Sequence, residues 1–282
     1  MREELPAVAG EPVARIRPGG TWDSALTSDE FAAIRSAGFE PVGQVFGAAV
    51  YSAGAASGSS CPATAGSSGG ALAQAMNQAR HTAIGRMKAE CAALGGHGVV
   101  GVRLSRGPFV LGGLEFSAIG TAVRAPGAAP RLPAPFTSGL SGQEFAKLIM
   151  TGWVPAGLVL GISIESRHDD RATTRQARRR SGNAEVAGWT ELVSQSRHDA
   201  RGELENDVRR LGADGVVIAT MRMRVRERDC PVQPGRRDHI VEATLIGTAI
   251  ARFSAAGPPG GGPALAIMSL DPQRLQAARI RI

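Results

Sequence analysis

The sequence of 282 residues is poor in cysteine and lacks long apolar runs. Its three cysteines, Cys61, Cys91 and Cys230, form no Cys-x-x-Cys pair, which excludes a disulfide framework and the usual closely spaced zinc ligands. No stretch approaches the roughly 18 apolar residues that a membrane span needs, and residues 1–20 lack the apolar run of a signal peptide. We therefore expect a cytoplasmic protein with reduced thiols.

Lysine and aromatic residues are also scarce. Lys88 and Lys147 are the only lysines, so arginine supplies nearly all of the positive charge behind the formal net charge of +7. Aromatic residues make up 4% and hydrophobic residues 43% of the chain, which predicts a core of Val, Leu, Ile and Ala. The arginine excess has two interpretations: composition bias from a GC-rich genome, which we favour, or attraction to an acidic partner.

Recognised catalytic and phosphate-binding motifs are absent. The chain has no Gly-x-Ser-x-Gly elbow, no Cys–His signature and no glycine-rich phosphate loop. Two pairs of carboxylates recur at matching places, Glu90 with Asp207 and Glu115 with Glu242, and helix charges and strand ends explain them. We therefore expect a protein that is not an enzyme.

What the sequence does contain is an internal repeat. Three segments recur in the same order: 80–100 as 197–217, 31–50 as 145–164, and 115–123 as 242–250. The first of these pairs shares Arg, His, Ala, Gly, Leu, Gly, Gly, Val and Val without a gap. Matched blocks in one order indicate a tandem duplication of one domain.

Each copy is expected to form a short helix, a strand, a long helix and two further strands. Apolar residues at three- and four-residue steps predict the long helices over 72–94 and 189–211. Thr-Ser-Asp-Glu at 27–30 and Ser-Gly-Gln-Glu at 141–144 fit capping boxes for the short helices. Glycines inside the first strand of each copy indicate bulges or a close backbone approach at Gly43, Gly47, Gly157 and Gly161.

The repeat also sets the expected domain boundaries. In chain order, we expect a disordered segment at 1–26, a first domain at 27–125, a linker at 126–136, a second domain at 137–253, and a Gly/Pro-rich linker with a tail at 254–282. Residues 165–182 differ completely from the matching segment 53–70, so we expect a loop at that place in each copy.

A combination of short motifs carries a family resemblance. These are Ala-Arg at 79–80, Leu-Gly-Ala-Asp-Gly-Val-Val at 211–217, Gly-Thr-Ala-Val at 120–123 and Gly-Thr-Ala-Ile at 248–251. With the glycine-rich opening strands, they resemble the YbjQ-like family of heavy-metal-binding domains. The resemblance implies an α+β fold of two dodecin-like domains, each with one long helix packed on a mainly antiparallel sheet. It also implies assembly into pentameric rings and a heavy-metal ion as the ligand.

Four residues are candidate metal ligands: Cys91, His97, His81 and His198. Cys91 lies beside the apolar stripe of its helix, where we favour a buried small hydrophobic residue. His97 aligns with Asp214 just past the long helix, where we favour a local cap over a ligand. A soft-metal site confined to one copy, through any of the three cysteines, is a further option.

His81 and His198 occupy equivalent places, and each follows an arginine, Arg80 or Arg197. By helical phase, these arginines lie to the side of the apolar stripe. There an arginine covers the core with its aliphatic stem or binds a carboxylate at a domain interface. We favour interface or core support over ligand binding at both places.

A basic stretch at 167–180 is the candidate surface for phosphate, with Arg175, Arg178, Arg179 and Arg180 as contacts. No aromatic residues are interleaved with it, so base stacking is not expected and a solvated loop is favoured. Our leading hypothesis is a non-enzymatic, ring-shaped homo-oligomer, most simply a pentamer, that binds a ligand or a heavy-metal ion. The alternative is a phosphate- or nucleic-acid-binding module that uses this basic stretch.

Overall fold

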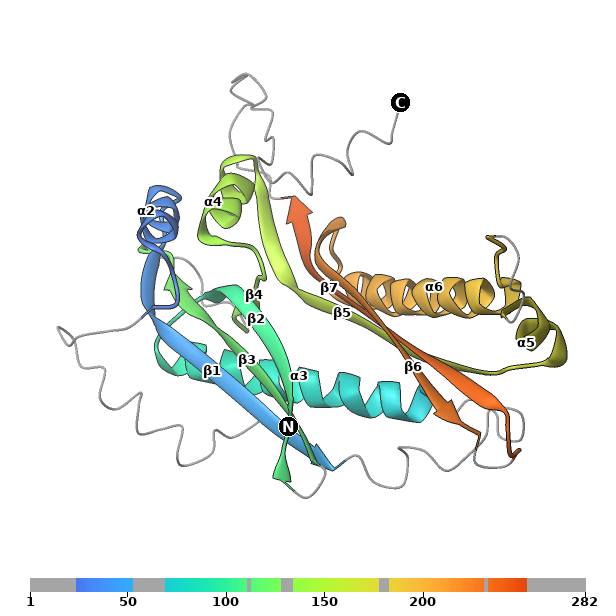
Figure 1. The fold of residues 1–282 in the computed structure, drawn as a ribbon. Coiled ribbons are helices and arrows are strands. Elements are labelled where there is room, and N and C mark those ends of the chain that lie inside the picture. The colour runs from blue at the N-terminus through green and yellow to red at the C-terminus, as the bar shows by residue number, and fades with distance from the viewer. Residues whose placement is uncertain are drawn as a thin grey trace.

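The computed structural model describes six stretches of the chain: 24–52, 69–110, 113–127, 134–177, 183–230 and 233–252. The first half, 24–127, contains α2 (Ser28–Ser36), β1 (Glu40–Ser52), α3 (Gly69–Ala93), β2 (Gly98–Pro108) and β3 (Gly113–Arg124). The second half, 134–252, contains β4 (Phe136–Thr137), α4 (Gly142–Met150), β5 (Trp153–His168), α5 (Arg171–Ala177), α6 (Ala187–Arg210), β6 (Gly215–Asp229) and β7 (Arg237–Arg252). Figure 1 shows one long helix beside each sheet, α3 in the first half and α6 in the second.

The strands form two sheets with the same order of matching elements. The first sheet has the order β1-β3-β2-β4, in which only the short pair β2–β4 is parallel. The second sheet has the order β5-β7-β6 and is antiparallel throughout. The predicted α+β class, with one long helix and a mainly antiparallel sheet in each half, is therefore confirmed.

Both short helices begin at the predicted capping boxes. The hydroxyl of Thr27 accepts from the backbone N–H of Glu30, whose carboxylate accepts from the N–H of Thr27 at 2.8 Å. Ser141 and Glu144 make the same reciprocal pair at the start of α4. Each box satisfies two of the backbone donors that a helix leaves open at its first turn.

The recurrent glycines have the two roles that their positions predict. The strand register shifts at matching places, between Pro41 and Gly43 and between Pro155 and Gly157. A Cβ atom on Gly47 would collide with the carbonyl oxygen of Ala83 on α3, and one on Gly161 with that of Ala200 on α6. Each long helix therefore lies directly against the backbone of its strand, where any larger residue would push it away.

The long helices lie on opposite faces of the second sheet. Met87 of α3 shares one apolar cluster with Val45 of β1 and with Leu160 of β5, so α3 is packed against both sheets. Leu204 of α6 shares another cluster with Val159 of β5. Successive side chains along a strand point to opposite faces, so Leu160 faces α3 and Val159 faces α6. The core of the second half is thus completed by the helix of the first.

The chain that leads into α4 completes the sheet of the first half. Beyond β4, the N–H of Ser138 donates to the carbonyl of Val99 at 2.8 Å, and the N–H of Val102 donates to the carbonyl of Ser138 at 2.9 Å. The N–H of Gly101 donates to the carbonyl of Leu140 at 3.0 Å. These bonds extend the outer edge of β2 with a segment of the second half.

The two short helices form a second junction between the halves. Ile34 of α2 and Phe145 of α4 lie in one apolar cluster with Val123 of β3. The ring of Phe39 meets that of Phe145 edge-on, with 5.1 Å between centroids. Figure 1 shows α2 and α4 close together at one end of the molecule.

The segment expected to be a loop at 165–182 is largely regular. β5 continues to His168, which pairs with Asp238 of β7, and Arg171–Ala177 forms α5. The loop prediction is wrong for these residues because β7 and β5 stay paired beyond the matching strands of the first half. Arg178, Arg179 and Arg180 lie outside the described residues, as does Cys61.

Candidate metal centre

The candidate site lies where the strands of the second sheet extend beyond the length of the matching strands of the first sheet. β5, β6 and β7 span 16, 15 and 16 residues, whereas the matching β1, β2 and β3 span 13, 11 and 12. The extra residues bring together the end of β5, the residue after β6 and the start of β7. At this place His168, Cys230 and Asp238 each offer one ligand atom, and the three atoms lie within 4.8 Å of one another.

The imidazole of His168 is held between two oxygen atoms. Its Nδ1 lies 2.9 Å from Oδ1 of Asp238, and its Nε2 lies 3.1 Å from Oε1 of Gln233. The carbonyl oxygen of Gln233 only accepts, so Nε2 carries a proton in this arrangement. A neutral ring would then direct the lone pair of Nδ1 at a carboxylate, which is repulsive unless a proton or a metal cation lies between them. The hydrogen bond with Asp238 accordingly raises the pKa of His168 above its usual range.

The other two candidate ligands are buried and oriented. The Asp238 side chain is fully buried, and Nε of Arg228 donates to its second oxygen, Oδ2, at 3.3 Å. The Sγ atom of Cys230 accepts from the N–H of Gln233 at 3.3 Å, and the N–H of Cys230 donates to the carbonyl of Arg236 at 2.8 Å. Such partners fix the direction of metal ligands.

The donor set fits a soft or borderline divalent ion. Thiolate, imidazole and carboxylate are all ligands of Zn²⁺, and thiolate favours softer ions such as Cd²⁺ over Mg²⁺ or Ca²⁺. Bonds of about 2.0–2.3 Å place tetrahedral ligand atoms roughly 3.3–3.8 Å apart. Ligand atoms within 4.8 Å reach that spacing with small side-chain rotations. The residues present therefore fit three protein ligands with a fourth position for water.

Two of the predicted ligands have other partners. Cys91 is fully buried, its thiol donates to the carbonyl of Gly98 at 3.4 Å, and burial raises its pKa to about 12. A thiol that stays neutral is a poor ligand, because metals bind the thiolate. Nδ1 of His97 accepts from the N–H of Ala125 at 3.2 Å, and the N–H of His97 donates to the carbonyl of Val123. His97 thus joins the turn after α3 to the end of β3.

The other two predicted ligands lie on the long helices. Nε2 of His81 on α3 lies 3.9 Å from the carboxylate of Asp207 on α6, and burial lowers the pKa of His81 although Asp207 opposes this. His198 is exposed on α6. None of the four predicted ligands belongs to the cluster at His168, so their role in metal binding stays a prediction.

The two predicted interface arginines differ in their surroundings. Arg80 is buried, and its guanidinium lies 5.6 Å from the ring centroid of Phe116. Burial and the nearby Arg106 lower the pKa of Arg80 to about 10, whereas Glu242 of the second half attracts its charge. Arg197, at the matching place on α6, is exposed. The structure therefore places Arg80 at the junction of the halves and Arg197 on an outer surface.

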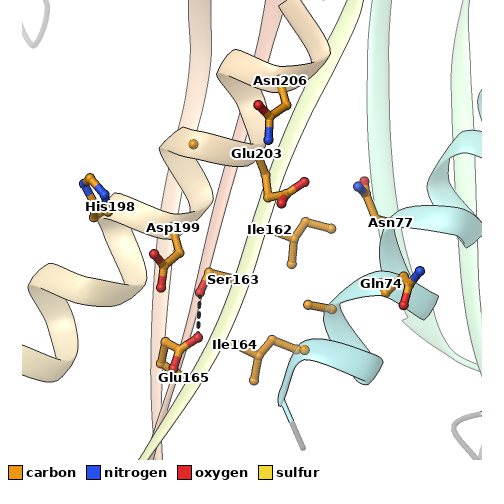
Figure 2. A pocket seen from close by; sticks show the side chains of 13 residues that line it. Gln74, Asn77, Ile162, Ser163, Ile164, Glu165, His198, Asp199, Glu203 and Asn206 are labelled. Carbon is orange, nitrogen blue, oxygen red and sulfur yellow. Dashed lines mark hydrogen bonds between the residues drawn. The ribbon is translucent and has the colours of Figure 1, made fainter. Parts of the chain in front are cut away.

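A cleft of about 580 Å³ lies along β5, the edge strand of the second sheet, between α3 and α6. Figure 2 shows Glu203 and Asp199 of α6, Glu165 of β5 and Asn77 of α3 around it, with His198 at its edge. Burial and the neighbouring Asp199 raise the pKa of Glu165. The cleft is acidic, but its carboxylates are exposed or half-buried and carry no built ligand geometry.

Arg175 of the basic stretch lies on α5 at a second cleft. Arg171, Arg236 and Arg237 also line it, together with two acidic residues. Within the described residues, the hypothesis of phosphate binding by the basic stretch therefore applies to this cleft.

Sequence reasoning missed two of the three residues at the metal cluster. Cys230 belongs to the option of a soft-metal site confined to one copy, whereas no sequence pattern points to His168 or Asp238. The signal that was available is their absence from the first half: His168 lies in a stretch that differs completely from its matching segment, and Asp238 lies before the part of β7 that matches β3. Spacing along the chain gives no indication, because His168 and Asp238 are 70 residues apart.

Comparison with known proteins establishes the family. A family model described as "Putative heavy-metal-binding", for YbjQ-like domains, matches residues 34–126, and the chain belongs to this family. The chain is similar to "Encapsulin nanocompartment protein Rv1762c" of Mycobacterium tuberculosis (strain ATCC 25618 / H37Rv), at 37% identity over 225 residues, covering 76% of this chain and 81% of that protein. No solved structure matches the chain at a significant level. Within the described residues, no helix is long and apolar enough to cross a membrane.

Proposed function

We propose that this protein is a non-enzymatic, metal-binding scaffold that holds one soft or borderline divalent ion, such as Zn²⁺ or Cd²⁺, between His168, Cys230 and Asp238. The observation that carries the proposal is the convergence of three different ligand types within 4.8 Å at the ends of three strands. The matched family region, 34–126, does not include these residues, so the site is a property of the second half alone.

The surroundings of the cluster support a site built before the ion arrives. Gln233 holds the imidazole so that Nδ1 faces Asp238, and Arg228 holds the outer oxygen of Asp238. An ion would enter between Nδ1, Oδ1 and Sγ after small rotations of the side chains, and the contacts to Gln233 and Arg228 would limit how far the imidazole and the carboxylate turn. Binding is expected to release protons, because the thiol and the imidazole must both be deprotonated.

The wider setting of the proposal is a self-associating protein. We propose that the two halves arose by tandem duplication and that five chains form a ring-shaped homo-oligomer. We also propose a cytoplasmic location, which keeps the Cys230 thiol reduced. The name of the mycobacterial relative refers to an encapsulin nanocompartment. We extend to this chain the general idea that it takes part in a large protein assembly.

Titration calorimetry on the reduced full chain tests the site. The apo protein, stripped with a chelator, is titrated with Zn²⁺ and separately with Cd²⁺ at neutral pH. We expect one ion per chain and, with Cd²⁺, an ultraviolet thiolate-to-metal absorption band. Cys230→Ser should abolish the band, and His168→Gln should weaken affinity by at least about tenfold.

The matched controls are His198→Gln, at an exposed predicted ligand, and Cys91→Val, at the buried thiol. Both should bind as the wild type does. The proposal is wrong if the wild type binds neither ion, or if Cys230→Ser and His168→Gln bind as tightly as the controls.

A second candidate function is phosphate binding at the basic cleft. The observation in its favour is that Arg171, Arg175, Arg236 and Arg237 line one cleft. Arg237 is already paired with Glu227 at 2.7 Å, which weakens the case. Inorganic phosphate or an oligonucleotide should bind with an affinity that falls steeply with salt. Binding that Arg171→Ser and Arg175→Ser leave unchanged would rule out this cleft.

A further inference from the structure

One face of the first sheet is apolar, and none of the described residues covers it. Phe46 and Val50 of β1 point to the face opposite α3, and they are 49% and 50% exposed. Their partners across the strand pair are Ile119 and Glu115 of β3. Exposed aromatic and aliphatic side chains side by side on a sheet mark an interaction surface more often than isolated ones do.

The matching face of the second sheet is covered. Because 31–50 aligns with 145–164, Phe46 corresponds to Leu160 and Val50 to Ile164. Leu160 is 0% and Ile164 is 4% exposed, since both lie in apolar clusters with α3 of the first half. The chain therefore contains one example of how the open face is covered: by the long helix of another half.

A second open surface lies on β6, at the other end of the chain. Its counterpart β2 is bonded along its outer edge by Ser138 and Leu140 of the second half. No described residue pairs with the outer edge of β6, where Ile218 is 46% exposed, whereas Val102, close to the matching place on β2, is 6% exposed.

The segment that would fill this edge is also repeated. By the same alignment, Ser24–Leu26 corresponds to Ser138–Leu140. Each segment makes the same bond to its own sheet: the N–H of Ala25 donates to the hydroxyl of Thr121 at 3.3 Å, and the N–H of Gly139 donates to that of Thr248 at 3.0 Å. The segment around Gly139 also bonds to β2 of the half that precedes it. For the segment around Ala25, the described residues include no preceding half.

The charges agree with the same arrangement. At the junction inside the chain, Arg80 of α3 is attracted by Glu242 of the following half. The residues at the corresponding places are Arg197, which is exposed on α6, and Glu115, which lies beside Val50 on the open face. Suppose that the first half of a second chain packs against the second half of this chain as the two halves pack within one chain. Arg197 of this chain then lies near Glu115 of the second chain.

We infer that the open face of the first sheet is the docking surface for α6 of a second copy of this chain, in a head-to-tail contact that repeats the junction between the two halves. The same contact places Ser24–Leu26 of one copy against the outer edge of β6 of the other. It covers Phe46 and Val50, completes the edge of β6 and pairs Arg197 with Glu115. One contact thus satisfies three separate features that the described residues of a single chain leave open.

The outer face of α6 sets the strength of this contact. Arg201 of α6 stands where α3 has Ile84, which is buried in the junction inside the chain. Arg201 can pack only its aliphatic stem there. The contact between copies is therefore expected to be weaker than the junction within the chain, and assembly should depend on protein concentration. Head-to-tail contacts close into a ring or extend as a filament, and each chain fills two consecutive positions.

Sedimentation velocity on the full chain across micromolar concentrations tests the inference. The wild type should sediment as an oligomer that dissociates on dilution. Phe46→Glu with Val50→Glu should give a monomer with unchanged circular dichroism and melting temperature. The matched control is Val110→Glu, since Val110 is 70% exposed in the turn after β2 and belongs to none of the strands or segments that form the proposed contact. It should assemble as the wild type does.

A charge exchange separates this contact from a general loss of apolar surface. Arg197→Glu and Glu115→Arg alone should each weaken association by about tenfold, and the two together should restore it. A wild type that stays monomeric would show that another part of the same chain covers the face and would overturn the inference. So would an oligomer that Phe46→Glu with Val50→Glu leaves intact, or single charge variants without effect.

Discussion

The carboxylate of Asp207 on α6 accepts a hydrogen bond from the backbone N–H of Leu160 on β5 at 3.0 Å. Glu90 on α3 makes the same contact with the N–H of Phe46 on β1, at 2.6 Å. Both strands lie at the edge of their sheets, where a backbone N–H has no neighbouring strand to bond with. A helix carboxylate therefore replaces the missing strand at one point of each edge.

The first prediction concerns Asp207. Its side chain is buried, so Asp207→Ala leaves the N–H of Leu160 without its acceptor and should cost about 1–3 kcal/mol of stability. Asp207→Asn keeps an acceptor oxygen and should cost less. Urea unfolding of the three proteins checks the order. Equal stability of Asp207→Ala and the wild type would mean that water satisfies the N–H.

The second prediction concerns the close approach of α6 to β5. A Cβ on Gly161 would collide with the backbone of Ala200, which cannot move without moving the helix. Gly161→Ala should therefore lose more than about 2 kcal/mol of stability. Thermal and urea unfolding measure the loss.

A matched control for Gly161→Ala lies on the helix itself. Gly202 of α6 has no heavy atom within 4 Å of the position of an added Cβ. Gly202→Ala should stabilise the protein by about 0.5–1 kcal/mol, because glycine is unfavourable inside a helix. Similar effects of the two substitutions would contradict the explanation by steric collision.

Local features of this fold could be predicted from the sequence. The capping boxes at Thr27 and Ser141 depend on residues three positions apart, and the register shifts at Gly43 and Gly157 follow single glycines. The internal repeat strengthened each of these, because both copies carry the same local pattern.

Features that depend on distant segments were not predictable. The bonds between Ser138 and β2 join two halves that the repeat suggested were separate domains. The extension of β5 depends on its pairing with β7, and a stretch rich in arginine gives no sign of it. For the same reason the candidate metal centre could not be predicted from the sequence: His168, Cys230 and Asp238 meet only once that pairing exists.

The third prediction concerns the ion pair that joins the two halves. Arg106 of β2 lies 2.8 Å from Glu242 of β7, whose side chain is only 6% exposed. Arg106→Ala leaves a buried carboxylate without its hydrogen-bonded partner and should cost about 3 kcal/mol. Replacing both residues with leucine should recover much of the loss. A double-mutant cycle by urea unfolding measures the coupling, and a coupling near zero would show that Arg80 neutralises Glu242 by itself.

The last prediction is a pH dependence of stability that comes from Cys91. Burial raises the pKa of this thiol from 9.0 to about 12 in the folded protein. The folded state therefore favours the neutral thiol. The stability that this preference contributes is fully present below the pKa of the thiol in the unfolded chain, and it is lost as the pH rises from about 9 toward 12.

Cys91→Val is the matched variant, because valine stands at the equivalent position, Val208, on α6. The wild type should lose stability relative to Cys91→Val by about 1.4 kcal/mol for each pH unit above 9, while the difference stays constant near neutral pH. Urea unfolding of both proteins under reducing conditions measures this, and the other titrating groups cancel in the comparison. A difference that does not change with alkaline pH would mean that the Cys91 thiolate forms in the folded core without cost. In that case Cys91 would return as a candidate metal ligand.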